Sequence, residues 1–225
     1  MTGIPRSTVR EWRVGRVPGA NRRTRPPKRP CPICHPKRAD LPPADYAYVF
    51  GLYLGDGCVS KGPRTYCLRF FLDAAYPGIV VRCREALEAI RPKQRAWARL
   101  SKTSRCYVVA MYSNHWPCLL PQHGPGRKHQ RRIALLGWQV EILDAHRREF
   151  VRGLIHSDGC RIVANDRGVK SIRYHFSNKS EDIKSLYCQS LDALGVSWTR
   201  PCHRQVAVYR KSSVAVLDDF IGPKR

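Results

Sequence analysis

The chain has 225 residues, and its 41 Lys and Arg against 17 Asp and Glu give a formal net charge of +24. Apolar residues make up 43% of the sequence, which is enough to bury a core and excludes a wholly disordered chain. No run approaches the roughly 18 apolar residues of a membrane span, and the first residues lack the apolar region of a secretory signal. We therefore expect a cytoplasmic protein, associated with the nucleoid if the source is bacterial, and no membrane partner. Positive charge spread along the whole length favours nucleic acid as the partner.

Residues 1–43 differ in composition from the rest of the chain. Positions 1–40 hold eleven Lys or Arg against two acids, a net charge of 11 − 2 = +9, and nine of the seventeen prolines lie within 1–43. The run NRRTRPPKRP at 21–30 is incompatible with a helix interior because proline lacks the backbone N–H group. The segment is therefore expected to be an extended basic arm.

Two short motifs within this arm have functional interpretations. GIPRSTVREWR at 3–13 is similar to the recognition helix of a helix-turn-helix, with Arg10 and Arg13 one turn apart and directed at DNA. The alternatives are a truncated remnant or an arm that becomes ordered on DNA, and the arm is preferred because an isolated short helix is unstable. Cys31 and Cys34 in CPICH have zinc-ligand spacing, but no second pair lies at the usual distance, so zinc is the less favoured hypothesis.

The remainder of the chain contains an internal duplication. The decapeptide VFGLYLGDGC at 49–58 aligns without a gap with VRGLIHSDGC at 151–160, and two further pairs of segments follow in the same order. One matching decapeptide can arise by chance, whereas three in order indicate a duplicated unit of about 100 residues. We therefore expect a first repeat at 44–120, a linker at 121–143 and a second repeat at 144–225.

Both repeats have the same predicted order of elements: helix, two strands, helix, two strands and a short closing helix. In the first repeat, helices are expected at 44–56, 77–90 and 114–120, and strands at 58–61, 65–72, 95–101 and 106–113. In the second repeat, helices are expected at 144–158, 181–194 and 213–221, and strands at 160–164, 170–177, 197–203 and 205–211. The glycine that follows Asp at the end of each first helix is predicted to be a left-handed cap. The predicted fold class is α+β, with two pseudo-symmetric αββαββα repeats.

Small residues lie four positions apart on the first helix of each repeat, at Gly51, Gly55, Gly153 and Ser157. Because this spacing places them on one helix face, two such helices can cross at backbone distance. Their C-termini then bring Asp56 and Asp158 together. Two carboxylates beside two negative helix ends repel each other, and a divalent cation such as Mg²⁺ resolves that repulsion.

This order of elements, with Gly-Asp-Gly or Ser-Asp-Gly at the helix ends, resembles the LAGLIDADG homing endonucleases in their single-chain, two-motif form. VFGLYLGDG and VRGLIHSDG match the motif, and the resemblance covers about 46–221. Within the family the chain is similar to a bacterial group with a short N-terminal helix-turn-helix-like segment and the stretch HWPCLLPQHGPGRKH (115–129). The resemblance implies a saddle of strands on double-stranded DNA, and a monomer with no obligate protein partner. It also implies a Mg²⁺- or Mn²⁺-dependent double-strand cut with Asp56 and Asp158 as metal ligands.

The resemblance further implies supporting residues, namely a polar side chain at the end of the second strand and a basic one near the fourth. In this sequence the matching positions are Asp73, Asn178, Arg210 and Lys211. The first repeat has only Ser113 and Asn114 at the basic position, which leaves open whether the two cutting sites are equal. His156 replaces the usual acidic or apolar residue in the second motif. The alternative interpretation of the four matching residues, Asp73, Asn178, Arg210 and Lys211, is that each is a solvated strand end.

Alternation along the predicted strands places a set of basic side chains on the face turned away from the helices, where they would contact DNA phosphates and guanine edges. They are Arg69, Arg99, Arg173, His175, Arg200 and Arg204. For any single arginine, a generic contact with phosphate is the favoured interpretation. The residues do not specify a target site.

Two alternatives to the nuclease remain. A non-cleaving transcriptional regulator would keep the saddle of strands and lack the chemistry, and an RNA maturase would use the same fold on introns. Each Asp-Gly also has an ordinary interpretation as a helix-to-strand turn. Retention of both acids favours the nuclease, because a protein that only binds DNA would bear their repulsion without benefit.

Overall fold

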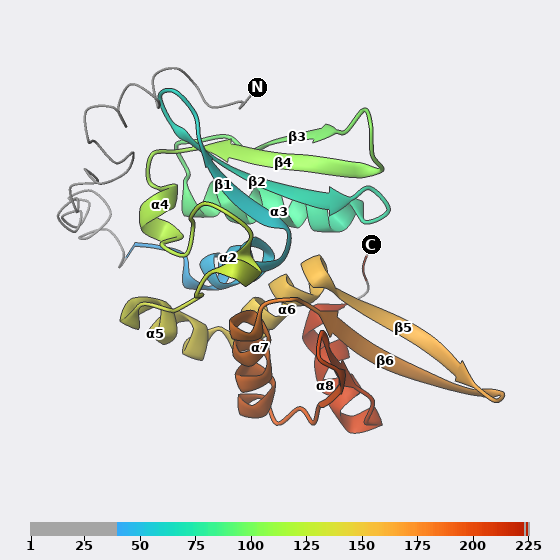
Figure 1. Cartoon of the computed structure of the whole chain (residues 1–225). Coiled ribbons are helices and arrows are strands. Elements are labelled where there is room, and N and C mark those ends of the chain that lie inside the picture. Colours follow the sequence, from blue (N-terminus) through green and yellow to red (C-terminus); the bar gives the residue numbers. More distant parts are fainter. Residues whose placement is uncertain (1–39, 223, 225) are drawn as a thin grey trace, which may run out of the picture.

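Two helices that cross at the centre of the molecule organise the fold. In the computed structural model, which describes residues 40–222 and 224, these helices are α2 (Pro43–Asp56) and α6 (Arg147–Asp158). They lie between the two repeats (Figure 1). The rings of Phe50 and Phe150 stack across the crossing with 5.9 Å between their centroids. Almost every residue of α2 from Tyr46 to Leu54 is buried, because α2 is covered by α6 on one side and by its own repeat on the other.

The first repeat forms a four-stranded antiparallel sheet in the order β1-β2-β4-β3. Its strands are β1 (Gly57–Lys61), β2 (Tyr66–Asp73), β3 (Trp97–Leu100) and β4 (Cys106–Tyr112). The helix α3 (Pro77–Ile90) packs against one face of this sheet, and the short helix α4 (Trp116–Leu119) follows β4. The tandem of two hairpins separated by a helix is the order that the sequence predicts.

The second repeat has the same topology, with its sheet in the order β5-β6-β8-β7. Its strands are β5 (Gly159–Asp166), β6 (Val169–Ser177), β7 (Thr199–Cys202) and β8 (Gln205–Val208), and its helices are α7 (Glu181–Ala193) and α8 (Lys211–Ile221). The β5–β6 hairpin extends away from the rest of the molecule (Figure 1). The predicted α+β fold with two αββαββα repeats is therefore confirmed.

Alternation along each strand separates a helix-packed face from an open face. In β2 the side chains of Leu68, Phe70 and Leu72 are buried against the helices, because burial of these apolar groups removes them from water. The intervening Arg69 and Phe71 point to the other side of the sheet. In β6 the same alternation buries Tyr174 and Phe176 and leaves Arg173 and His175 on the open face.

The segment between the repeats is more ordered than a linker. Residues 137–145 form a separate helix, α5 (Gly137–Ala145), so the helix predicted over 144–158 begins instead at Arg147. The break lies at His146, whose φ of −127° and ψ of 45° are not helical. Gln139 of α5 is fully buried, and its amide donates to the Tyr46 hydroxyl at 2.7 Å. This buried hydrogen bond attaches the inter-repeat segment to α2.

Several strand boundaries differ from the prediction, most clearly in the β5–β6 hairpin and at the end of β8. The second-repeat hairpin continues to Asp166 and turns through Arg167 and Gly168, whose φ angles are 52° and 90°. These two positive φ angles are typical of a two-residue hairpin turn, which leaves Asp166 in the ladder. The last strand, β8, ends at Val208, three residues earlier than predicted. Within the described residues, no helix is long and apolar enough to span a membrane.

Candidate functional site

The crossing of α2 and α6 brings the two backbones into direct contact at a pair of glycines. A Cβ atom on Gly51 would lie 2.4 Å from the carbonyl oxygen of Phe150, and one on Gly153 would lie 2.2 Å from that of Tyr48. Both distances are shorter than any van der Waals contact, so neither position accommodates a side chain. The small residues are therefore what permits the two helices to cross at this separation.

A second layer of small residues lies one turn closer to the helix ends. A Cβ atom on Gly55 would lie 2.2 Å from Oγ of Ser157 and 3.2 Å from Cγ of Asp158. The Ser157 hydroxyl donates back to the carbonyls of its own helix, to Leu154 at 3.0 Å and to Gly153 at 3.1 Å. The last turn of α2 thus lies against the last turn of α6, and the acids that end these helices share one edge of the molecule.

The glycines that follow the two acids are not left-handed caps, which corrects the prediction. Gly57 has φ −88° and Gly159 has φ −106°, both in the extended region that any residue adopts. Glycine is required at both positions for a steric reason. A Cβ atom would lie 2.6 Å from Cα of Tyr53 at position 57 and 2.7 Å from Cα of Ile155 at position 159. Each chain therefore leaves its helix tightly against the last turn and passes directly into the first strand of the sheet.

The electrostatic environment of both acids disfavours two charged carboxylates. Burial, followed by the negative charge of Asp158, raises the pKa of Asp56 to about 6. Burial also raises the pKa of Asp158, and a hydrogen bond from the Asn178 amide at 2.6 Å opposes that rise. A cation near these acids would relieve both effects.

Lys128, from the segment between the repeats, supplies one such cation. Its ammonium group donates to the carbonyl oxygen of Leu54 at 2.9 Å and also to those of Tyr53 and Gly55, at the negative end of α2. Burial lowers the pKa of Lys128 to about 8, while the two acids oppose that shift. The position is secured by Arg131, whose guanidinium holds the preceding loop through its backbone carbonyls.

Lys224 provides a matching cation for the other helix. Its ammonium group donates to the carbonyl oxygen of Gly159, which follows the end of α6, and lies 5.6 Å from the centre of the Tyr76 ring. Burial lowers the pKa of this lysine, and the nearby Asp56 and Asp158 oppose the change. Sequence reasoning missed both lysines. A signal was present, since each repeat ends with a closing helix, a Gly-Pro pair and a lysine a few residues later (GPGRK at 124–128 and GPK at 222–224).

Among the hollows beside the pair of acids, two contain both a carboxylate and a lysine. The larger, of about 480 Å³, is lined by Asp158, Asn178 and Lys128. The smaller, of about 130 Å³, is lined by Asp56, Asp73 and Lys224. The two halves of the site are therefore similar in plan but differ in one group, which is an amide at Asn178 and a carboxylate at Asp73. This second acid makes the Asp56 half the more negative of the two.

The predicted supporting residues divide into those that reach the site and those that do not. Asp73 and Asn178 do, at the ends of β2 and β6. Arg210 and Lys211 do not belong to a strand, because they begin α8 and are exposed. The reason is topological: β8 is antiparallel to β6, so its end lies beside Tyr174 rather than beside Asn178. The basic groups of the site come instead from Lys128 and Lys224.

The corresponding positions of the first repeat also lack a basic group. Ser113 is buried, and its hydroxyl accepts a hydrogen bond from the backbone N–H of His115 at 3.2 Å. In the second motif, His156 lines the smaller hollow, and its Nδ1 lies 3.0 Å from the Tyr48 hydroxyl. Burial lowers the pKa of His156 to about 4, so this imidazole is neutral near pH 7.

Four of the six basic residues predicted to face DNA lie on the open faces of the sheets. Arg69 donates to Ser60 Oγ at 3.1 Å across β1 and β2, and Arg99 is exposed on β3. Arg173 forms an ion pair with Asp166. His175 packs edge-on against Tyr209 with ring centroids 5.9 Å apart.

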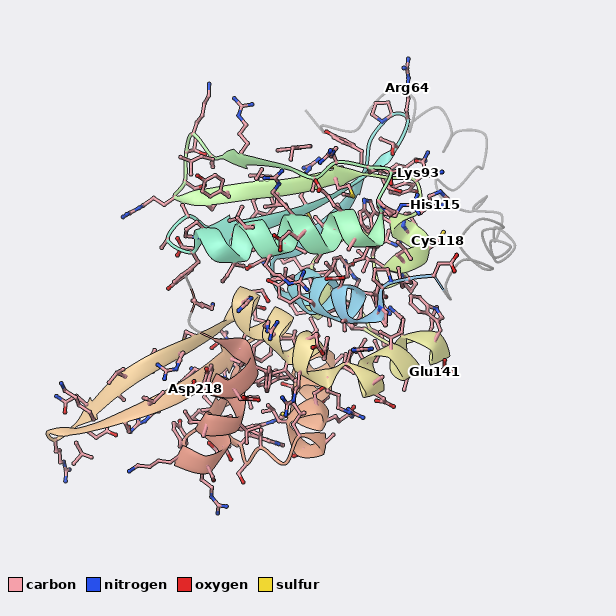
Figure 2. The ribbon with its side chains drawn as sticks, turned by 180° about the vertical axis from the view of Figure 1, so that it is seen from behind. Arg64, Lys93, His115, Cys118, Glu141 and Asp218 are labelled. Atoms are coloured by element: carbon pink, nitrogen blue, oxygen red, sulfur yellow. The ribbon has the colours of Figure 1, made fainter. Side chains whose placement is uncertain are left out.

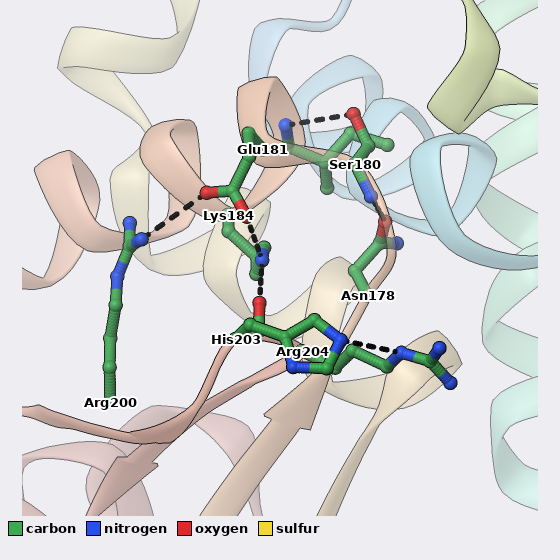
Figure 3. Close-up of polar contacts among 8 residues, drawn as sticks. Asn178, Ser180, Glu181, Lys184, Arg200, His203 and Arg204 are labelled. Atoms are coloured by element: carbon green, nitrogen blue, oxygen red, sulfur yellow. Dashed lines mark hydrogen bonds and ion pairs between the residues drawn. The ribbon is translucent and has the colours of Figure 1, made fainter.

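Arg200 lies on the opposite face, which corrects the prediction. Thr199 pairs with Ala207 on the open face, and the strand register shifts between Thr199 and Cys202, where Arg200 lies. Its guanidinium is 3.2 Å from the carboxylate of Glu181 at the start of α7 (Figure 3). Arg204 occupies the turn between β7 and β8, where its backbone carbonyl accepts from the Asn178 N–H group. Its guanidinium donates to His203 Nε2 at 3.0 Å and extends away from Glu181 (Figure 3).

The remaining predicted residues, Arg10, Arg13, Cys31 and Cys34, lie outside the described residues. Among the residues that the structure describes, no group of three or more His, Cys, Asp or Glu side chains is arranged to hold a metal ion. A cation at this site would therefore have two protein carboxylates and would take its other ligands from water and substrate.

Comparison with solved structures identifies the fold. The structure of I-DmoI in complex with DNA and Mn is 14% identical in sequence, with a TM-score of 0.52 over 80% of this chain and 98% of that chain. I-WcaI bound to its DNA recognition sequence is 10% identical, with a TM-score of 0.50 over 82% and 83%. Full-length DUF199/WhiA from Thermatoga maritima is 16% identical, with a TM-score of 0.50 over 81% of this chain and 56% of that one. No family model and no curated protein matches the sequence. The chain has the two-repeat LAGLIDADG fold.

Proposed function

We propose that this protein binds double-stranded DNA and makes a double-strand cut that depends on a divalent metal ion. The observation that carries the proposal is the meeting of Asp56 and Asp158 at the ends of two helices that cross at backbone contact. Strand ends from both repeats surround this pair together with Lys128 and Lys224, so a single chain contains both halves of the site. The net charge of +24 supplies the attraction to a polyanion of this size.

The donor set fits Mg²⁺ or Mn²⁺. Asp56 and Asp158 would hold the ion, since one or two carboxylates with water and a substrate phosphate form the usual Mg²⁺ site. Burial raises the pKa of both acids, and the charge of Asp158 adds to the rise at Asp56, so this environment favours a cation beside them. A bound divalent ion would supply a more acidic water and charge stabilisation at the leaving oxygen of a phosphodiester.

The residues of the chain have distinct roles around that centre. Asn178 holds one carboxylate oxygen of Asp158 and so orients it. Lys128 and Lys224 place positive charge at the helix ends, where a phosphate would otherwise meet two negative carboxylates and two helix C-termini. Basic side chains on the open faces, such as Arg69 and Arg99, would contact the DNA backbone on either side of the cut.

A non-cleaving DNA-binding regulator is the second candidate, and the two lysines favour it. If the acids lacked cations of their own, only a metal ion would relieve their repulsion. Lys128 and Lys224 already provide two positive charges there, so the acid pair is compatible with a folded protein that holds no metal. The chain shares its fold with DUF199/WhiA as well as with I-DmoI and I-WcaI, so the fold does not single out the nuclease.

Incubation with a randomised plasmid library, with and without Mg²⁺, followed by sequencing of the ends, tests the proposal. We expect discrete Mg²⁺-dependent breaks that Asp56→Asn and Asp158→Asn each abolish. DNA affinity in these variants should stay equal or rise, because a charge that repels phosphate is removed. Asp219→Asn is the matched control, since it removes an exposed acid of α8 that pairs with Arg148 of α6. Sites that are bound but never cut by the wild-type protein would support the regulator instead.

A further inference from the structure

The open face of the first-repeat sheet is unusually rich in aromatic side chains. Phe71 of β2 is 46% exposed, Trp97 of β3 is 39% exposed and Tyr112 of β4 is 52% exposed. All three stand on the face that turns away from α3, because they alternate with the buried residues of their strands. Hydrophobic groups exposed in this number on one sheet face are typical of a binding surface rather than of ordinary solvent-facing strands.

The ladder register places these side chains in rows across the sheet. Nearest the acids, Phe71 pairs with Val108 and Val108 pairs with Arg99. In the next row outward, Ala110 lies between Arg69 and Trp97. Each row thus combines an apolar group with an arginine. Figure 2 shows the other side of the molecule, where Arg64 extends from the β1–β2 turn beyond these rows.

This surface is continuous with the candidate site. A hollow of about 700 Å³ is lined by Asp56, Asp73 and Phe71, and a second of about 320 Å³ is lined by Trp97, Arg99 and Val108. Phe71 and Val108 are direct partners in the ladder, so the two hollows adjoin. A ligand that reaches Asp56 from this side would therefore pass over the apolar rows.

The equivalent positions of the second repeat are polar. Register identifies them, since Gly57 pairs with Phe70 in the first repeat as Gly159 pairs with Phe176 in the second. Phe70 and Phe176 are therefore equivalent. The residues that follow them in each strand are equivalent too, and so are the ladder partners of those residues. By this correspondence Phe71, Val108 and Trp97 of the first repeat are matched by Ser177, Gln205 and Thr199 of the second.

We propose that the first repeat recognises thymine through its 5-methyl group, by means of Phe71, Val108 and Trp97, whereas the equivalent positions of the second repeat, Ser177, Gln205 and Thr199, contact their bases through polar groups. The inference rests on the proposed binding of duplex DNA. The thymine methyl is the apolar group that bases present in the major groove. A cytosine amino group placed against Phe71 and Val108 would lose its hydration without gaining a partner, which disfavours that base.

Strand geometry locates the thymines. Two residues along an antiparallel strand advance about 6.8 Å, which equals about two base-pair steps of DNA. Phe71 is two residues before Asp73, so its row should read a base pair roughly two steps outward from the site. The row of Trp97, level with Arg69, should read one roughly four steps outward. The arginines in these rows hold the flanking phosphates, which suits a duplex lying along the sheet.

The test uses the full chain without divalent metal, so that cutting plays no part. Preferred duplexes are selected from a randomised pool, and each thymine of a selected site is then replaced by deoxyuridine, which pairs identically but lacks the methyl group. Because one buried methyl group contributes a modest free energy, we expect the Kd to rise about three- to fivefold for each contacted thymine. At the equivalent positions of the opposite half-site, two and four steps outward, the replacement should leave the Kd unchanged.

Variants test whether the sensitivity to deoxyuridine comes from the apolar side chains of the first-repeat sheet. Phe71→Ser combined with Val108→Gln installs the second-repeat residues, and should make binding insensitive to deoxyuridine at the inner position. Ser177→Ala is the control and should retain the sensitivity. Circular dichroism and a thermal melt verify that each variant is folded, which is expected because Phe71 lies on the surface.

The outcomes separate this inference from the proposed function. Equal effects of deoxyuridine in both half-sites, or no effect in either, would overturn the thymine assignment while leaving duplex binding intact. Selected duplexes that are bound but stay uncut after Mg²⁺ is added would count against the nuclease and leave this inference standing. Preference for single-stranded oligonucleotides would indicate stacking of bases on the rings and overturn it, and absence of any duplex binding would overturn both.

Discussion

The ammonium group of Lys128 lies 2.9 Å from the carbonyl oxygen of Leu54, 74 residues earlier in the chain. This contact places a positive charge at the negative end of α2, one turn from Asp56. It also makes the segment between the repeats part of the site, because Lys128 and Arg131 both belong to that segment. The two repeats are therefore joined by a chain that contributes to the electrostatics of the acids.

Lys128→Met is expected to destabilise the protein and to reduce cutting. The variant leaves backbone carbonyls at the end of α2 without their donor and removes a cation from beside two acids. A charged hydrogen-bond donor at a partly buried helix end contributes about 2 kcal/mol, so the free energy of unfolding should fall by roughly that amount. Guanidinium unfolding measures it.

Lys179→Met is the matched control for charge. Lys179 lines the same hollow but is exposed, so its loss should lower DNA affinity slightly without affecting stability. If the two variants unfold at the same denaturant concentration, the contact between Lys128 and α2 does not support the fold.

The glycine pair at the helix crossing allows a direct test of packing. Gly153→Ala would place a Cβ atom 2.2 Å from the Tyr48 carbonyl oxygen, and Gly51→Ala would place one 2.4 Å from that of Phe150. Since both obstacles are backbone atoms, the helices must separate, and we expect a loss of about 3 kcal/mol or more. Gly137→Ala is the control, because nothing lies within 4 Å of its Cβ position. Denaturant midpoints that match among the three variants would contradict the close crossing.

The pH dependence of stability follows from the raised pKa of Asp56, which is about 6 against an ordinary value of 3.8. In this range the folded protein binds more protons than the unfolded chain, so this carboxyl makes stability fall as pH rises from about 4 to about 6. Asp56→Asn removes that loss. In metal-free buffer the variant should match the wild-type protein at pH 4 and be roughly 1 to 3 kcal/mol more stable at pH 7.

The neighbouring His156 has the opposite dependence, because burial lowers its pKa to about 4 and the folded state then binds fewer protons between pH 4 and 6.5. The wild-type protein and the Asp56→Asn variant both contain this histidine, so its contribution largely cancels in the difference between their unfolding free energies. The quantity to compare is therefore the difference in unfolding free energy at each pH, with Asp219→Asn as control. A difference that stays constant from pH 4 to 7 would show that Asp56 ionises normally.

The basic arm should contribute to DNA affinity without supporting the fold. Residues 1–39 hold eleven Lys or Arg and one acid, a net charge of 11 − 1 = +10, whereas Leu41 is already buried in the core. Deletion of 1–39 should leave the thermal midpoint nearly unchanged. For the intact chain we expect log affinity to fall with log salt at a slope of about −5 to −9, and for the shortened chain a slope smaller by several units.

A zinc-stapled subdomain around Cys31 and Cys34 makes a different prediction. The intact chain would then retain one zinc ion through gel filtration, and chelation would weaken DNA binding as much as the deletion does. Metal analysis of the purified protein separates these outcomes. Aggregation of the shortened chain would mean that the arm packs on the rest of the protein.

The sequence by itself determined the parts of the fold that depend on local patterns. Small residues four positions apart lie on one helix face whatever surrounds them, and strand alternation follows from backbone geometry. The duplication then required that both helices meet, and so Asp56 and Asp158 were predictable as a pair. Asp73 and Asn178 were predictable for the same reason, since each ends the second strand of its repeat.

Only the tertiary structure decided which basic groups serve the acids. Lys128 and Lys224 lie far in sequence from the ends of α2 and α6, and although each follows a Gly-Pro pair, nothing in that pattern places its lysine beside the acids. The same holds for the direction of a side chain near an irregular strand end. Arg200 pairs with Glu181 at a register shift that follows Thr199, and that register depends on the neighbouring strand rather than on the residues of β7 themselves.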